Sequence, residues 1–207
     1  MKKISILVLA VLSFTAVLAQ KVDRKPLPKE VQIKLALQAA PSDLRNGAKV
    51  YGYDDSGKFI VLQEASNNNK MVCLAPDYKT STYYSYAYPQ SMDAFMERGR
   101  QLIAEGKRKQ RDEIREQEFK AGKLHIPQTP TMLYAYWGDA ADVNMETGEI
   151  KDAKRRYVIY MPFAKAEDIG LSSQHNNLGM PWLMDEGGYK AHIMITPPLE
   201  QHKHGSR

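Results

Sequence analysis

The 207-residue sequence contains a single cysteine, Cys73, so no disulfide can form within the chain. It also lacks a His-Glu-x-x-His motif, a Cys-x-x-Cys pair and a glycine-rich phosphate loop, which are common signatures of metal and nucleotide sites. Gly-x-Ser-x-Gly, the nucleophile elbow of many hydrolases, is absent as well. We therefore expect no metal site and no cofactor.

The chain has only one long apolar run, and that run lies at its N-terminus. Lys2 and Lys3 precede the apolar segment 4–18, which ends in the small-residue pattern before Ala19. This run of about 15 residues is too short to span a bilayer comfortably. The order of basic, apolar and small residues predicts a secretory signal peptide over 1–19, cleaved so that the mature chain begins at Gln20. The expected location is therefore periplasmic or secreted.

The charge balance gives no sign of a nucleic-acid partner. Of the 29 basic residues, cleavage after Ala19 removes Lys2 and Lys3 and keeps all 24 acidic residues, which leaves a net charge of +3. Such a mild excess favours solubility and a loose attraction to acidic surfaces. We expect an exported, soluble chain that does not span the membrane and binds no nucleic acid, with an envelope protein or a glycan as the open alternatives for a partner.

Local patterns predict an α+β domain. The expected strands are 50–53, 59–62, 71–74, 132–137, 156–161 and 192–196. The expected helices are 30–40, 91–105 and 107–121, with one helical turn at 165–169. The first three strands are expected to form a meander, and the glycine-rich segment 170–190 to be irregular.

Because these strands and helices segregate along the chain, we expect a mainly antiparallel sheet of about five to six strands, with two or three helices packed on one face. The expected domain spans 30–197, between an extended N-terminal arm at 20–29 and a flexible polar tail at 198–207. A division into two domains near Lys123 is the less favoured alternative, since each half would have few apolar residues for a core.

Several segments resemble a family of exported bacterial proteins that is itself uncharacterised. These segments are AAPSDLRNGA (39–48), MVCL (71–74), FMERGR (95–100), YVIYMPFA (157–164), GMPWLMD (179–185) and AHIM (191–194). The resemblance covers most of 30–197 and implies export and a single domain. It implies no activity, cofactor or catalytic residue.

The only thinkable nucleophile pair is Cys73 with His192. A cysteine nucleophile needs a neighbouring base or cation to lower its pKa, and His192 with Asp77 or Asp185 would provide one. Cys73 lies among apolar residues of an expected strand, however, so we expect it to be buried and unreactive. The pair remains an alternative hypothesis.

The other histidines and one acidic loop offer weaker candidates for chemistry. His125 and His175 have no partner at ligand spacing, and His202 and His204 lie in the polar tail. The segment 142–148 resembles the start of an EF-hand loop, but its glycine is one place late and the twelfth position is an alanine. An EF-hand is therefore rejected, and a weak ion site on this loop is the open alternative to a solvated hairpin end.

Aromatic residues provide the candidate binding surface. The chain has 12 tyrosines against 5 phenylalanines, and exposed tyrosine and tryptophan rings are common in glycan and peptide sites. The residues that would line such a cleft are Tyr83, Tyr84, Tyr86, Tyr88, Trp137 and Trp182. The competing interpretation is that these rings are buried in the core of the sheet.

Three hypotheses for function follow. The favoured one is an exported domain that binds a ligand or partner in the bacterial cell envelope without catalysis. The second is an envelope hydrolase or transferase that uses Cys73 and His192. The third is an accessory subunit of a larger envelope assembly. No catalytic or ligand-binding residue can be assigned from the sequence.

Overall fold

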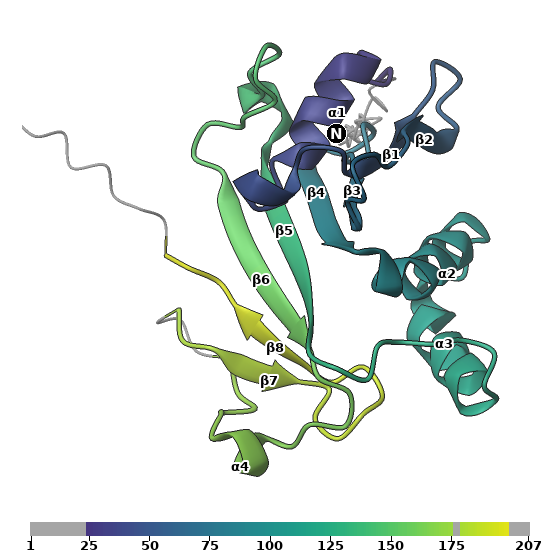
Figure 1. Cartoon of the computed structure of the whole chain (residues 1–207), viewed down its shortest axis with the longest axis vertical. Helices are drawn as coiled ribbons and strands as arrows, with labels where there is room; N and C mark the ends of the chain where they lie inside the picture. Colours follow the sequence, from purple (N-terminus) through teal and green to yellow (C-terminus); the bar gives the residue numbers. More distant parts are fainter. Residues whose placement is uncertain (1–23, 176–178, 199–207) are drawn as a thin grey trace, which may run out of the picture.

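The computed structural model describes residues 24–175 and 179–198, and Figure 1 shows their arrangement. The predicted signal peptide and nearly all of the predicted tail lie outside these residues. Eight strands form one sheet in the order β2-β1-β3-β4-β5-β6-β8-β7. The strands are β1 (Lys49–Tyr53), β2 (Phe59–Gln63), β3 (Met71–Leu74), β4 (Thr82–Pro89), β5 (Thr131–Asp139), β6 (Lys154–Tyr160), β7 (Trp182–Met184) and β8 (His192–Ile195).

Four α-helices accompany the sheet, with short 3₁₀ turns between elements. The α-helices are α1 (Lys29–Leu37), α2 (Asp93–Ala104), α3 (Arg111–Lys120) and α4 (Ala166–Ile169). The 3₁₀ turns are η1 (Ser42–Leu44), η2 (Gln90–Met92), η3 (Arg108–Gln110) and η4 (Ala140–Asp142). Within the described residues, no helix is long and apolar enough to cross a membrane.

The α+β class is confirmed, but the expected five to six strands and two or three helices are wrong. The two additional strands are β4, in the tyrosine-rich segment, and β7, inside the segment expected to be irregular. β4 alternates buried and more exposed side chains along most of its length, as a strand with two different faces should. β7 has three residues, too few for a periodic pattern to be recognised.

The expected meander is also wrong, because β3 pairs with β1 and not with β2. β1 and β3 run parallel, with Val50 opposite Cys73, and every other pair of neighbouring strands is antiparallel. The segment after β2 crosses beside Gly47, whose carbonyl accepts a hydrogen bond from Ser66. Gly47 has a φ of +78°, and a Cβ there would lie 2.5 Å from the Ser66 carbonyl oxygen. The crossing therefore needs glycine at this position.

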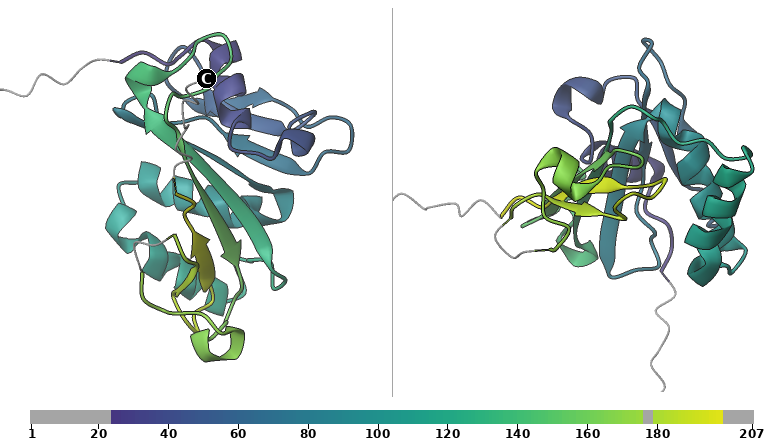
Figure 2. Two further views of the ribbon diagram at one scale, coloured as in Figure 1. Left: turned by 90° about the vertical axis from the view of Figure 1, so that its left-hand side faces the viewer. Right: turned by 90° about the horizontal axis from the view of Figure 1, so that it is seen from below.

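The helices cover opposite faces of the sheet, which corrects the expectation that they share one face. α1 packs Leu35 and Ala36 into a core with Val50 and Cys73. α2 packs Phe95 into a second core on the other side of the sheet. The left view in Figure 2 shows α1 in front of the sheet and α2 and α3 behind it. We call these sides the α1 face and the α2–α3 face.

Candidate functional site

The structure separates the predicted nucleophile pair. Cys73 lies in β3 and His192 lies in β8, with β4, β5 and β6 between them. Since neighbouring strands are about 4.8 Å apart, four such steps amount to roughly 19 Å. The register also places Cys73 on the α1 face and His192 on the α2–α3 face. The two side chains therefore cannot act together.

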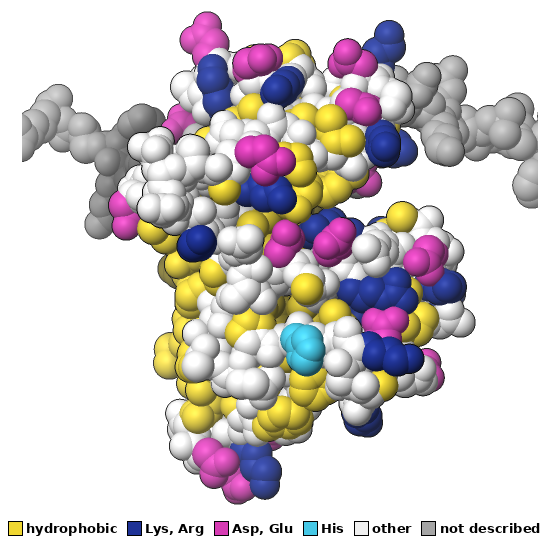
Figure 3. Space-filling view, turned by 45° about the vertical axis from the view of Figure 1, so that its right-hand side comes forward, with side chains coloured by type: hydrophobic (Ala, Val, Ile, Leu, Met, Phe, Trp, Pro, Cys, Tyr) yellow, Lys and Arg dark blue, Asp and Glu magenta, His cyan; other side chains and the backbone are white. Residues whose placement is uncertain are grey.

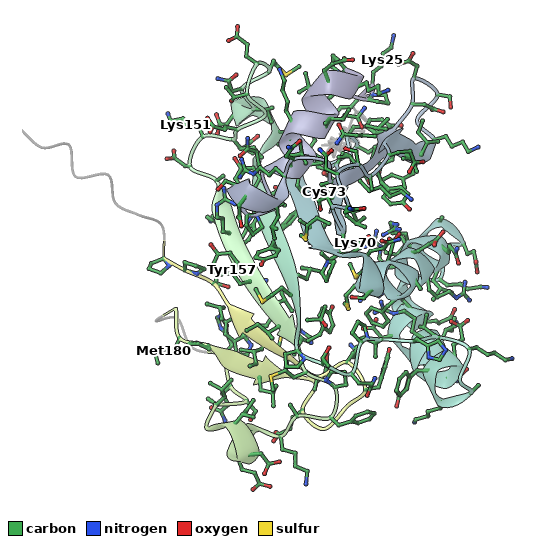
Figure 4. All side chains as sticks on the ribbon, in the orientation of Figure 1. Lys25, Lys70, Cys73, Lys151, Tyr157 and Met180 are labelled. Atoms are coloured by element: carbon green, nitrogen blue, oxygen red, sulfur yellow. The ribbon has the colours of Figure 1, made fainter. Side chains whose placement is uncertain are left out.

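Cys73 has the surroundings of an inert thiol, as predicted. Its side chain is 0% exposed and lies beneath α1, as Figure 4 shows. Burial raises the pKa of the thiol to about 12, and the charge of Arg45 opposes this rise only in part. Because the thiolate is the reactive form, this environment suppresses nucleophilic chemistry.

His192 belongs instead to a cluster of charged groups beside α3. Its Nδ1 donates a hydrogen bond to the Lys190 carbonyl (2.8 Å) and lies 3.7 Å from a carboxylate oxygen of Asp185. Burial lowers the pKa of His192, against the raising effects of the Lys190 carbonyl and the Asp185 charge. His192 and Asp185 are therefore neighbours, as the hypothesis required, but Cys73 is not beside them.

Asp112 is the centre of this cluster. Its carboxylate accepts hydrogen bonds from Arg111 (2.7 Å), Arg115 (2.8 Å) and Lys190 (3.0 Å). Burial favours a higher pKa for Asp112, but these hydrogen bonds outweigh it and hold the pKa well below its usual value. Lys190 also pairs with Asp185 at 3.0 Å, so the cluster connects α3 to the segment before β8. Figure 3 shows charges of both signs over the helical layer.

Three of the six predicted aromatic residues form one surface on the α2–α3 face. The ring of Tyr84 lies 5.6 Å from that of Trp137 and 6.3 Å from that of Tyr86, measured between centroids. Both ring pairs are close to parallel, at 12° and 14°. Tyr84 is 42% exposed, and Tyr86 and Trp137 are half-buried. We call Tyr84, Tyr86 and Trp137 the aromatic patch.

The other three aromatic residues have structural positions. Tyr83 lies on the α1 face and is buried in the core there. Tyr88 is fully buried, and its hydroxyl donates to Asp93 (3.0 Å) and accepts from Arg100 (2.8 Å). Trp182 is 5% exposed in β7, so for this ring the competing interpretation, burial, is the correct one. Of the six residues predicted to line an aromatic cleft, three therefore belong to the aromatic patch and three are buried in the core.

Basic residues border the aromatic patch, and they were not predicted as site residues. The guanidinium of Arg156 lies over the Trp137 ring, with Cζ 5.3 Å from the centroid. Lys154 is exposed on the same face of β6, directly opposite Trp137 in β5. The alternation of Lys154 and Arg156 along one strand indicates a shared basic face. The alternation of basic residues can be seen in the sequence, but the sequence does not show that this strand pairs with the strand of Trp137.

Two polar segments form shallow surface features. A depression of about 500 Å³ lies beside the turn 67–69 and is lined by Asp43, Leu44, Asn46, Asn67, Asn68, Asn69, Lys70 and Met71. The acidic loop packs on α1, where Lys34 donates to the Glu146 carbonyl (2.6 Å). Among the described residues, no group of three or more His, Cys, Asp and Glu side chains is placed to hold a metal ion.

The α1 face has an apolar region beyond the part that packs against α1. Half-buried side chains of three strands, β5, β6 and β8, make up this region: Met132, Tyr134, Tyr157, Ile159, Ile193 and Ile195. Figure 4 shows Tyr157 on this side of β6, away from α2 and α3. The two faces of the same strands thus differ in charge, because Lys154 and Arg156 border the aromatic patch on one face and the region on the other face has no charged residue among these six.

No protein-family model, curated protein or solved structure matches this chain.

Proposed function

We propose that the mature protein is an exported, non-enzymatic binding domain of the bacterial cell envelope, and that its aromatic patch binds a glycan. The observation that carries this proposal is the near-parallel arrangement of Tyr84 and Trp137, with Tyr84 substantially exposed. Large aromatic rings are normally buried, and a group of them at the surface is typical of a recognition site.

The chemistry of the patch suits sugars. A sugar ring presents C–H groups on its faces and hydroxyls at its rim, so it contacts an aromatic ring and exchanges hydrogen bonds with nearby polar groups. The Tyr84 and Tyr86 hydroxyls and the Arg156 guanidinium provide such groups beside the rings. The predicted signal peptide supports this choice, because export would bring the domain among envelope polysaccharides.

The alternative hypothesis of a hydrolase or transferase using Cys73 and His192 lacks support. Its two reactive groups lie on different faces of the sheet, and the thiol has a raised pKa. A catalytic function would therefore need other residues. We retain the binding hypothesis.

Calorimetric titration of the mature protein tests the proposal. The probes are soluble peptidoglycan fragments, a neutral glucan and two acidic polymers, polygalacturonate and teichoic acid. We expect at least one of these to bind, and the double variant Tyr84→Ala, Trp137→Ala to lose that binding while its circular dichroism is unchanged. Tyr157→Ala is the matched control, since it removes a half-buried tyrosine from the opposite face. Binding that survives in the double variant, or no binding by any probe, would refute the proposal.

A further inference from the structure

The register of three strands places two long polar side chains on either side of a small one. Tyr86 in β4 is opposite Ala135 in β5, and Ala135 is opposite Arg156 in β6. All three side chains project from the α2–α3 face, next to Trp137. The short methyl group of Ala135 separates the Tyr86 hydroxyl-bearing ring from the Arg156 guanidinium.

Arg156 is held in place without an acidic partner. Its Nε donates to the Thr196 hydroxyl (2.9 Å), and its guanidinium lies over the Trp137 ring. Over the described part of the chain, no carboxylate comes within 4.0 Å of this guanidinium, and its two terminal amino groups donate to no protein acceptor. A fixed guanidinium with free donors is suited to bind an anion.

The Tyr86 hydroxyl is a second polar group on this face, and Arg111 of α3 adds positive charge to its surroundings. Arg111 comes from α3 and donates through Nε to Asp112, which holds the start of its guanidinium in position. Burial raises the pKa of Tyr86, and the charges of Arg156 and Arg111 both oppose this rise. The Tyr86 hydroxyl has no hydrogen-bond partner among the described residues, although its side chain is more than half buried. A guanidinium and a hydroxyl with no partner among the described residues therefore project from neighbouring positions on one face of the sheet.

We propose that these positions bind an anionic group of the ligand, so that the glycan recognised by the aromatic patch is acidic. Arg156 would pair with the negative charge, the Tyr86 hydroxyl would donate to it, and Trp137 and Tyr84 would contact the sugar ring that carries it. This inference rests on the proposed function and narrows the ligand to a carboxylate- or phosphate-bearing polysaccharide. The basic face of β6 adds the exposed Lys154, which would attract a polyanion from solution.

Arginine forms two parallel hydrogen bonds to a planar carboxylate and also binds phosphate, so both sources share the same chemistry. The test therefore compares polygalacturonate, which carries carboxylates, with teichoic acid, which carries phosphates, and with a neutral glucan. We expect one of the acidic polymers to bind at least about tenfold more tightly than the neutral one, since hydrogen bonds to charged groups are the stronger kind. Binding should weaken as salt rises.

Two variants assign the preference to the proposed residues. Arg156→Gln removes the charge, and Tyr86→Phe removes only the hydroxyl and keeps the ring. Each should lower affinity for the acidic polymer about tenfold or more, and should lower affinity for the neutral glucan much less, because only the acidic polymer loses a charge-assisted contact. Lys29→Gln is the matched control, because it removes one exposed charge at the start of α1, on the opposite face.

Circular dichroism and melting temperature establish that the variants fold. Equal binding of acidic and neutral polymers, or an unchanged preference in Arg156→Gln, would overturn the inference while the binding function stands. No binding by any polymer would overturn both, so the two failures are distinguishable. Which acidic polymer binds identifies the anionic group.

Discussion

The guanidinium of Arg115 lies over the ring of Phe95, with Cζ 4.0 Å from the ring centroid. Arg115 is buried in α3, and its Nη1 donates to the Phe95 carbonyl in α2 (3.4 Å). A Cβ at Gly99 would lie 3.2 Å from that same nitrogen, so the guanidinium lies close against the backbone of α2 at this glycine. A charged side chain thus joins α3 to α2 where an apolar seam would be expected.

Because Arg115 is buried, loss of its carboxylate partner should be costly. Asp112→Ala removes the acceptor shared by Arg111, Arg115 and Lys190. We expect the free energy of unfolding to fall by roughly 1–3 kcal/mol, since a buried donor loses its charged partner and half-exposed pairs add little. Urea denaturation measures the change. Glu113→Ala, one residue along the same helix, is the control and should have little effect.

The same carboxylate predicts a dependence of stability on pH. The pKa of Asp112 is lower in the folded protein than in the unfolded chain, so its contribution is complete above the unfolded value of about 3.9 and declines as pH falls below it. The difference in stability between the wild type and Asp112→Ala should therefore be largest near neutral pH and smaller near pH 3. A difference that does not change with pH would mean that Asp112 does not titrate as inferred.

Cys73 should resist modification in the native protein. Its side chain is fully buried, and burial raises the pKa of the thiol to about 12, so almost no thiolate is present at neutral pH. A thiol reagent should label the protein slowly at pH 7 and rapidly after denaturation. Fast labelling of the native state would contradict this and would reopen the question of a reactive cysteine.

The N-terminal residues predict processing on export. The sequence of basic, apolar and small residues that ends at Ala19 should direct cleavage, so that the exported protein begins at Gln20. Intact-mass measurement of protein recovered from the periplasm or medium of an expressing bacterium decides the point. A mass that includes Met1 would show that the segment is retained.

Local sequence patterns were sufficient for most elements but not for their pairing. The strand 156–161 was expected from its β-forming residues, and β6 is found at Lys154–Tyr160. β3 lies beside β1 because the segment 64–70 crosses near Gly47. The periodicity of apolar residues predicts strands but does not predict how such a connecting segment runs. β4 was not among the expected strands, because the alternating tyrosines of this segment do not by themselves show that the backbone is extended.

The site was predictable to a similar extent. Tyr84, Tyr86 and Trp137 were selected by residue type, and their residue types favour surface binding as much as core packing. Which tyrosines are exposed depends on the placement of α1 and α2 on opposite faces, since Tyr83 and Tyr88 are each buried by one of them. Arg156 became part of the site only through the pairing of β5 with β6, which local sequence does not reveal.

Trp182 should be important for stability. It is buried in β7, opposite Met194 of β8, and its ring meets the His175 ring edge-on at 4.5 Å. Truncation of a buried tryptophan removes a large apolar contact and leaves a cavity, at a typical cost of about 3–5 kcal/mol. This is a large fraction of a total stability of about 5–15 kcal/mol. We therefore expect Trp182→Ala to lower the melting temperature sharply.

Met184→Ala is the matched control for this variant. Met184 lies on the same strand and the same face as Trp182, two residues further on, but it is 39% exposed. Its truncation should change the free energy of unfolding by no more than about 0.5 kcal/mol, as is usual for surface substitutions. Comparison of the melting curves of Trp182→Ala and Met184→Ala shows whether the loss of stability comes from burial of the side chain or from any substitution in β7. If Trp182→Ala melts like the wild type and instead loses ligand binding, the segment around β7 is a binding element, and the structural role inferred for this tryptophan is wrong.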